Sequence, residues 1–242
     1  MIHNEHYDEG VQGETKKFNL GDFPLQQGAT LRGAWISYRT HGTLNTAKDN
    51  AILFPHMYSG SHKDMEFYLQ SGWACDPGEY FIILPGQFGN GVSSSPSNTL
   101  PPYNMGAFPN VQIEDDVIAQ HRLVTEEFGI TELQLVTGWS MGAQQTYEWA
   151  IRFPDMVKRA APIAGTAKCT PHDQIFIEAH MEQIKSDPNF NNGFYTEPHS
   201  CHVGLRRHAQ VWGVMGCCTE FYKTKAWRQY GFSSTNDFVQ GY

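Results

Sequence analysis

Residues 133–142 read LQLVTGWSMG, an apolar run that leads into a Gly-x-Ser-x-Gly pattern at Gly138, Ser140 and Gly142. The run of residues 133–136 is short and rich in leucine and valine, which is typical of a buried parallel strand. The glycines that flank Ser140 indicate a sharp change of chain direction directly after this strand. This segment therefore predicts a strand that is followed at once by a tight turn around a serine.

A helix is expected directly after that turn. Ala143, Tyr147 and Ala150 share one helical face, and Pro154 ends the pattern after residue 153. A glycine-flanked serine between a strand and a helix forms a nucleophile elbow, in which the seryl Oγ projects above the carboxyl edge of the sheet. We therefore predict Ser140 as a catalytic nucleophile; the alternative is a serine that only caps the helix.

Strand-like and helical patterns alternate around this segment. The further strand-like runs are residues 31–39, 51–54, 80–84 and 159–163. Apolar residues recur at helical spacing through residues 113–128, and Glu114, Asp115 and Asp116 fall in the first turn, where carboxylates suit the positive end of the helix dipole. The sequence thus predicts an α/β fold with a mostly parallel sheet flanked by helices.

The pattern changes from Thr170 onward. Helical patterns in residues 175–184 and 205–216 are separated by the polar loop 186–200, and no strand-like run follows before Tyr242. We therefore expect an incomplete α/β core in residues 1–169 and a helical lid region in residues 170–242. The aromatic side chains of this region either line an acyl pocket or form its core, and the core is the commoner use of such spacing.

Composition excludes several classes of function. The chain has 17 Lys and Arg against 25 Asp and Glu, a net charge of −8, and no basic run that would neutralise a phosphate backbone. No run approaches the roughly 18 apolar residues of a membrane span, and the first ten residues carry His, Asn, Glu and Asp in place of an apolar core. With an odd count of five cysteines, we expect a reduced, cytoplasmic protein without nucleic-acid or membrane partners.

One cluster invites a metal hypothesis. It consists of His199, Cys201 and His202, with Cys217 and Cys218 downstream. The paired Cys-x-x-Cys and His spacings of zinc sites are missing, as are the glycine-rich motifs of phosphate and dinucleotide sites. The sequence therefore predicts neither a metal nor a cofactor.

An acyl-transfer nucleophile needs an oxyanion hole built from backbone amides. One amide usually belongs to the residue after the nucleophile, which is Met141. The other usually lies on a loop after an earlier strand, and residues 56–60 follow the strand-like run 51–54. We choose Tyr58 from this loop; the alternative is an ordinary glycine-containing turn.

Further motifs resemble the homoserine O-acetyltransferase family of the α/β-hydrolase fold, from about Phe18 to the C-terminus. They are residues 35–45 (WISYRTHGTLN), 49–51 (DNA), 56–62, 117–123 (VIAQHRL) and 138–149. The resemblance implies acylation of Ser140, oxyanion amides at Met141 and Tyr58, and a small-molecule ester or acyl-CoA substrate. Independently of the resemblance, the strand-like run 159–163 would be an unprotected sheet edge if late strands are missing, so we expect pairing with another copy as a homo-oligomer, or aggregation.

Two departures bear on the acyl acceptor. Acetyltransferases of this family generally carry Gly-Gly-Ser-Met-Gly-Gly at the elbow, whereas residues 138–143 read GWSMGA. The loop of residues 86–98 also differs from the transferase pattern and is similar to the esterase-like branch, whose members pass the acyl group to water. The resemblance therefore implies an esterase-like hydrolase or an O-acyltransferase, with hydrolysis favoured.

The catalytic acid and base are not assigned. In α/β-hydrolases the triad order is Ser, Asp, His, and the last two lie on loops after strands that follow the lid. The aspartates and histidines after Ser140 do not follow strand-like runs in this order; they are Asp155, Asp173, Asp187, Asp237, His172, His180, His199, His202 and His208. We expect a truncated, split or partial family member, with late strands missing and little activity of its own.

Two alternatives remain. Asp237 or His208 is recruited in place of the usual triad members, or the chain is a non-enzymatic binding module on a hydrolase scaffold. Turnover of a simple aryl acetate discriminates an enzyme from a binding module.

Overall fold

The computed structural model describes residues 4–241, which divide into two compact units. The first unit ends at Lys168 and contains a six-stranded sheet with its helices; the second begins at Cys169 and is helical.

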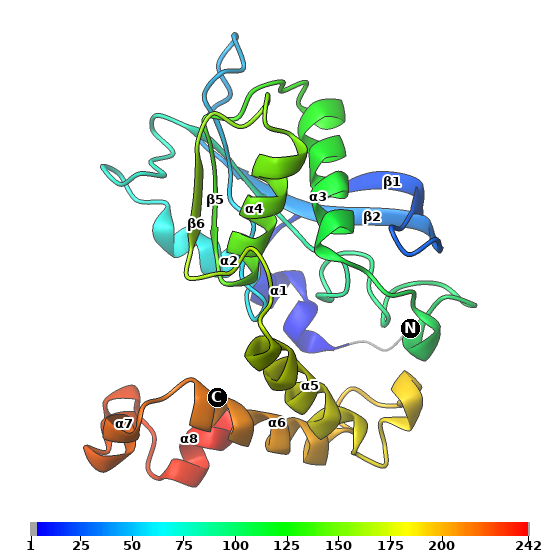
Figure 1. Cartoon of the computed structure of the whole chain (residues 1–242), viewed down its shortest axis with the longest axis vertical. Helices are drawn as coiled ribbons and strands as arrows, with labels where there is room; N and C mark the ends of the chain where they lie inside the picture. The colour runs from blue at the N-terminus through cyan, green and yellow to red at the C-terminus, as the bar shows by residue number, and fades with distance from the viewer. Residues whose placement is uncertain (1–3, 242) are drawn as a thin grey trace. The chain divides into compact units, whose positions relative to one another are not determined.

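The sheet of the first unit is mixed, and most of its strands are parallel (Figure 1). In spatial order the strands are β1 (Lys16–Pro24), β2 (Thr30–His41), β4 (Phe81–Pro85), β3 (Ala51–Leu53), β5 (Leu135–Trp139) and β6 (Ala160–Ile163). Strand β2 is antiparallel to both of its neighbours, whereas β4, β3, β5 and β6 run parallel. The expected α/β fold is confirmed, and the strand before Ser140 lies in the interior of the sheet.

Apolar side chains project from both faces of the central strands and are buried on both. Leu53 and Ile83 pack with residues of α3 (Ile113–Arg122) and α4 (Met141–Arg152), which lie side by side on one face (Figure 1). Ile52, Ile82 and Leu84 belong to a second cluster with Met65, at the end of α2 (His62–Met65). Burial on both faces explains why these strands are continuously apolar in the sequence.

A buried polar chain fixes α3 to α4. The Trp149 indole Nε1 donates to Gln120 Oε1 at 2.9 Å, and Gln120 Nε2 donates to Gln145 Oε1 at 2.6 Å. All three side chains are fully buried, so these hydrogen bonds replace contacts with water that burial removed.

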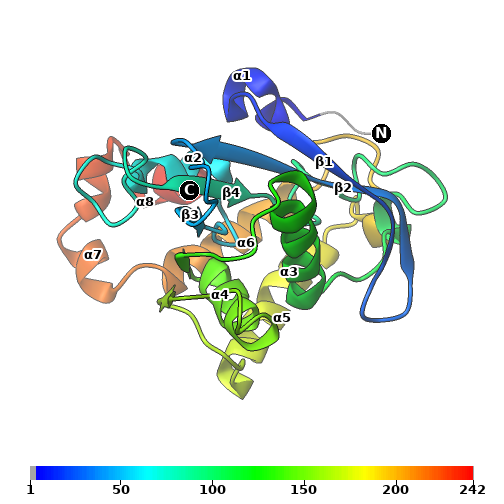
Figure 2. The same cartoon turned by 90° about the horizontal axis from the view of Figure 1, so that it is seen from above.

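The strand β1 was missed by the sequence patterns. It pairs with β2 as an antiparallel hairpin (Figure 2), and its register shifts on either side of Gly21. Phe18 and Leu20 are buried with a spacing of two, but the next buried residue, Phe23, follows at a spacing of three. The irregular register breaks the period-two alternation by which a half-buried strand is recognised.

The other predicted elements are confirmed with small shifts. Strand β5 begins at Leu135, because Leu133 makes only an isolated bridge to Val157. The expected helix 113–128 is α-helical to Arg122 and continues as the π-helix η4 (Leu123–Glu127). Helix α4 ends at Arg152, one residue before the predicted end.

The second unit consists of helical segments. They are α5 (Pro171–Lys185), η5 (Asn191–Gly193), α6 (His202–Met215), α7 (Thr219–Lys223), η6 (Ala226–Tyr230) and α8 (Thr235–Gly241). Helix α5 starts at a capping box, in which the Thr170 hydroxyl accepts from the Asp173 amide and the Asp173 carboxylate accepts from the Thr170 amide at 2.8 Å.

Aromatic side chains pack against one another inside the helical unit. The rings of Phe176 and Trp212 have centroids 5.4 Å apart, and Phe221 and Phe238 lie at 5.2 Å. Trp227 is buried. This packing supports the core interpretation of these residues over an acyl pocket.

Among residues 4–241, no helix has the length and hydrophobicity required to cross a lipid bilayer.

Candidate active site

Ser140 lies between β5 and α4 in a strained backbone conformation. Its φ of 56° and ψ of −123° are rare for a residue with a Cβ atom, and such conformations cost about 1–3 kcal/mol. The Ser140 amide donates to the Ile163 carbonyl of β6 at 3.1 Å, and the Ser140 carbonyl accepts from the Ala143 amide at 3.0 Å. Neighbouring backbone thus holds the strained turn in place and leaves the Ser140 side chain exposed.

The two flanking glycines allow the backbone to pass without a clash. A Cβ atom on Gly138 would lie 2.5 Å from the Gly142 carbonyl oxygen, and one on Gly142 would lie 2.4 Å from the Pro55 carbonyl oxygen. Both distances are too short for real side chains, so the pattern at this turn is a steric requirement. Because the Gly142 backbone lies so close to Pro55, the start of α4 is beside the loop that carries Tyr58.

The amides of Met141 and Tyr58 are both unengaged. Met141 is the first residue of α4, where backbone N–H groups have no intrahelical acceptor. Within the described part of the chain, neither amide donates to another residue. Both residues line a cleft of about 720 Å³; Ser140 does not line it but directly precedes Met141.

Hydrogen bonds among buried polar groups hold the loop that carries Tyr58. His56 Nδ1 lies 2.8 Å from the Met57 carbonyl oxygen, and His56 Nε2 lies 3.1 Å from Asn90 Nδ2. Gln87 Nε2 donates to the His56 carbonyl at 2.6 Å. Burial lowers the pKa of His56 to about 4. The ring is therefore neutral, with Nδ1–H as donor and Nε2 as acceptor.

Asp116 is a second buried group at the cleft. Its Oδ1 accepts from the Phe88 amide at 2.7 Å, and the residue lines the cleft. Burial, with a smaller effect of Asp115, raises the pKa of Asp116 to about 8, so the carboxyl is largely protonated at neutral pH.

The sequence pattern predicts the same role, at the positive end of the helix dipole, for Asp115 and Asp116. Asp115 does act at the helix start, since it accepts from the Gln112 and Gln26 amides, both at 2.8 Å. Asp116 has a different environment, because its partner Phe88 lies on another loop. No local signal distinguishes the two.

No histidine engages Ser140 by a hydrogen bond within residues 4–241. His208, one candidate for recruitment, lies with its Nδ1 3.1 Å from His180 Nδ1 and accepts from the Trp212 indole at 2.9 Å. The Asp237 carboxylate accepts from the Ser233 amide at 2.7 Å. Both side chains therefore have partners inside the helical unit. The described residues also contain no group of three or more potential metal ligands.

The chain is similar to known proteins of the alpha/beta hydrolase fold. A family model for the alpha/beta hydrolase fold matches residues 50–207. A probable esterase of Corynebacterium glutamicum is 50% identical over 236 residues, covering 97% of this chain and 68% of the relative. An ethyl acetate hydrolase of Pseudomonas veronii is 48% identical over 240 residues, covering 99% of this chain and 69% of the relative.

The chain is also similar to a more distant sequence relative and to a solved structure. A homoserine O-acetyltransferase of Leptospira biflexa is 32% identical over 247 residues, covering 94% of this chain and 65% of the relative. The crystal structure of an acetylester hydrolase from Corynebacterium glutamicum matches with a TM-score of 0.95 at 49% identity, covering 100% of this chain and 71% of that one. The chain therefore belongs to the α/β-hydrolase fold family, in the homoserine O-acetyltransferase-like group that includes these esterases.

Proposed function

We propose that this chain carries the nucleophile and the oxyanion hole of an esterase that cleaves small acetate-type esters through an acyl-enzyme on Ser140. The observation that carries the proposal is the strained, exposed Ser140 beside the unengaged Met141 amide. Strain of this kind persists where surrounding structure enforces it, and it is common at catalytic positions.

The geometry supports a two-step reaction. Ser140 Oγ attacks the ester carbonyl carbon, and the amides of Met141 and Tyr58 donate to the oxyanion that forms. The tetrahedral intermediate then expels the alcohol and leaves the acyl group on Ser140. Water attacks this acyl-enzyme, releases the carboxylic acid and restores the serine.

The reaction also needs a base for the Ser140 proton. In Ser-His-Asp enzymes a histidine takes this proton and an aspartate orients the histidine. Because no described histidine engages Ser140, we expect the 242-residue chain by itself to turn esters over slowly. Loss of triad members lowers protease rates by on the order of 10⁴ to 10⁶.

Hydrolysis is favoured over transfer to homoserine. The relatives at 48–50% identity are named as esterases, whereas the Leptospira homoserine O-acetyltransferase is 32% identical. The GWSMGA elbow of residues 138–143 is also the departure from the transferase pattern noted above. A small ester is accordingly preferred to acyl-CoA as substrate.

Labelling with a fluorophosphonate probe tests the nucleophile. Because no described base engages Ser140, we expect slow modification of Ser140 by the probe, located by peptide mass spectrometry after long incubation, and no labelling of the Ser140→Ala variant. Labelling that persists in Ser140→Ala would assign the nucleophile elsewhere, and an unlabelled wild type without aryl acetate turnover would favour the binding module. Acetate release measured against O-acetylhomoserine formation separates hydrolysis from transfer.

A further inference from the structure

The segment before the first strand forms one side of the cleft. It contains the short helices η1 (Glu5–Tyr7) and α1 (Glu9–Gln12). His6, Tyr7, Val11 and Gln12 line the cleft of about 720 Å³ that also exposes Tyr58 and Met141. The segment is far from both residues in the sequence, so specific contacts must hold it there.

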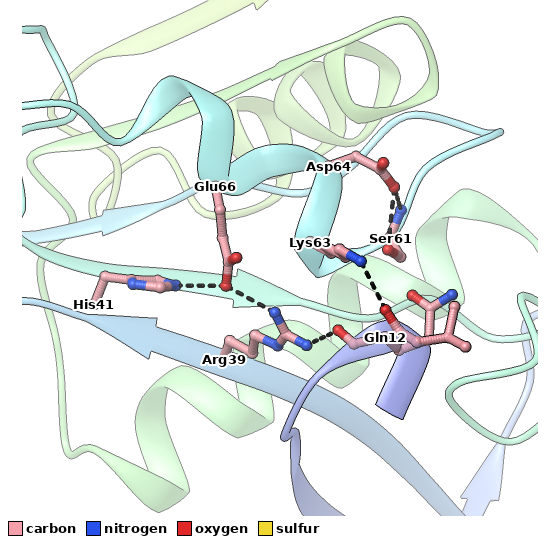
Figure 3. A network of polar contacts seen from close by, with 8 residues as sticks. Gln12, Arg39, His41, Ser61, Lys63, Asp64 and Glu66 are labelled. Atoms are coloured by element: carbon pink, nitrogen blue, oxygen red, sulfur yellow. Dashed lines mark hydrogen bonds and ion pairs between the residues drawn. The ribbon is translucent and has the colours of Figure 1, made fainter. Parts of the chain in front are cut away.

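Two basic side chains provide these contacts (Figure 3). The Arg39 guanidinium of β2 lies between Glu66 and the end of α1; its Nη1 donates to Glu66 Oε1 at 2.7 Å, and its Nη2 donates to the Gln12 carbonyl. Lys63 Nζ of α2 donates to the Val11 carbonyl at 2.8 Å. Carbonyls at a helix C-terminus lack intrahelical donors and carry partial negative charge, which suits both cations.

Arg39 and Lys63 together form a clamp on the carbonyl end of α1, and the Glu66 carboxylate orients the Arg39 guanidinium of this clamp. Glu66 Oε1 lies 3.3 Å from His41 Nε2 as well as accepting from Arg39. The Arg39 side chain is 10% exposed and the Glu66 side chain 36% exposed, so water reaches this ion pair mainly from the Glu66 side. The clamp thus fixes the carbonyl end of α1 to β2 and α2, two elements of the folded core.

Tyr7 projects from the clamped segment onto the loop after β4. A Cβ atom on Gly91 would lie 2.3 Å from the Tyr7 ring, so the ring fills the space that a side chain at residue 91 would need. Gly91 also has a φ of +88°, which favours glycine independently. Partial burial and the neighbouring Tyr58 hydroxyl raise the pKa of the Tyr7 phenol, which stays neutral at physiological pH. Tyr7 therefore sits between the Tyr58 loop and the Gly91 loop.

We propose that residues 5–12 are a strap that completes the ester-binding cleft, and that the Tyr7 ring, held over Gly91 beside Tyr58, limits the size of the acyl group accepted. The proposal rests on the esterase function proposed above. Its physical basis is volume: with Tyr7 in place a long acyl chain meets an aromatic ring, and with Tyr7 removed it enters the space that the ring occupied.

Substitution of Tyr7 tests the size limit in a single turnover. Tyr7→Ala opens the space, Tyr7→Phe keeps the ring, and Tyr103→Ala removes a tyrosine of similar exposure that does not line the cleft. The measurement is the release of p-nitrophenolate in a single turnover, with the protein in excess over the acetate, butyrate or hexanoate ester. This release requires acylation of Ser140 and does not depend on hydrolysis of the acyl-enzyme. Each methylene that gains an apolar environment is worth about fourfold.

We expect Tyr7→Ala to raise the hexanoate-to-acetate ratio of acylation rates by at least about tenfold. Tyr7→Phe and Tyr103→Ala retain the wild-type ratio. A release that is lost in Ser140→Ala but has the same ratio in Tyr7→Ala overturns the strap and leaves the esterase proposal standing.

A binding measurement tests the size limit without acylation, because acylation is slow where no base engages Ser140. Saturation-transfer NMR with ethyl acetate and ethyl hexanoate, which differ in the acyl group, then compares the same variants. A rise in the binding of ethyl hexanoate over ethyl acetate in Tyr7→Ala supports the size limit. An unchanged ratio, or no ester bound by any variant, overturns it.

Discussion

Replacement of Asp116 by asparagine should remove a pH-dependent loss of stability. The pKa of Asp116 is about 8 in the folded chain against an ordinary value of 3.8. Between these values the folded state holds a proton that the unfolded state releases, so the free energy of unfolding falls as pH rises. The slope is at most about 1.4 kcal/mol for each pH unit, and the loss is complete above the folded-state pKa.

The Asp116→Asn substitution keeps an acceptor for the Phe88 amide but introduces a side chain that does not titrate. We therefore expect the stability of Asp116→Asn relative to wild type to increase by about 2–3 kcal/mol between pH 5 and pH 7. Urea unfolding at pH 5, 6 and 7, at constant ionic strength, measures this difference.

Asp76 supplies a matched control in the same unit. Hydrogen bonds from the Gly72 and Gly78 amides lower its pKa, so it is ionised in both states from pH 5 to pH 7. The difference between Asp76→Asn and wild type should thus be independent of pH in this range. A difference for Asp116→Asn that is equally flat would refute the assignment of a protonated, buried carboxyl.

Two further substitutions test the elbow and the helix contact behind it. Gly142→Ala places a Cβ atom 2.4 Å from the Pro55 carbonyl oxygen. Urea unfolding should show a loss of at least about 2 kcal/mol and fluorophosphonate labelling should disappear; wild-type stability and labelling would contradict the steric role of this glycine. Gln120→Leu leaves the buried Trp149 indole N–H without its acceptor, so we expect a loss of about 1–3 kcal/mol in the same unfolding assay; wild-type stability would contradict a role for this hydrogen bond.

The elements predicted well from the sequence are those with local signals. The strand before Ser140 and the helix after it follow from a short apolar run, two glycines and a terminating proline, all within residues 133–154. The helix that begins after Thr170 also carries a local signal, a capping box within four residues, although its apolar spacing predicts it only from residue 175. Such features are determined by neighbours along the chain, so a single sequence reveals them.

The features that were missed depend on contacts between distant segments. Asp116 differs from Asp115 only because the Phe88 amide and the surrounding core enclose it. The strap of residues 5–12 is polar and short, and its place at the cleft depends on Arg39 and Lys63. The roles of Ser140, Met141 and Tyr58 stay predictions, supported by their placement.

The strained backbone at Ser140 lowers the stability of the fold while it holds the hydroxyl proposed for catalysis, which matters for any engineering of this protein. About 1–3 kcal/mol of strain is a substantial share of the roughly 5–15 kcal/mol by which folded domains are stable. Glycine accepts a positive φ without this strain, so a library selected for thermostability alone would favour glycine at residue 140 and discard the hydroxyl. Selection for a more stable variant therefore has to score ester cleavage in the same round.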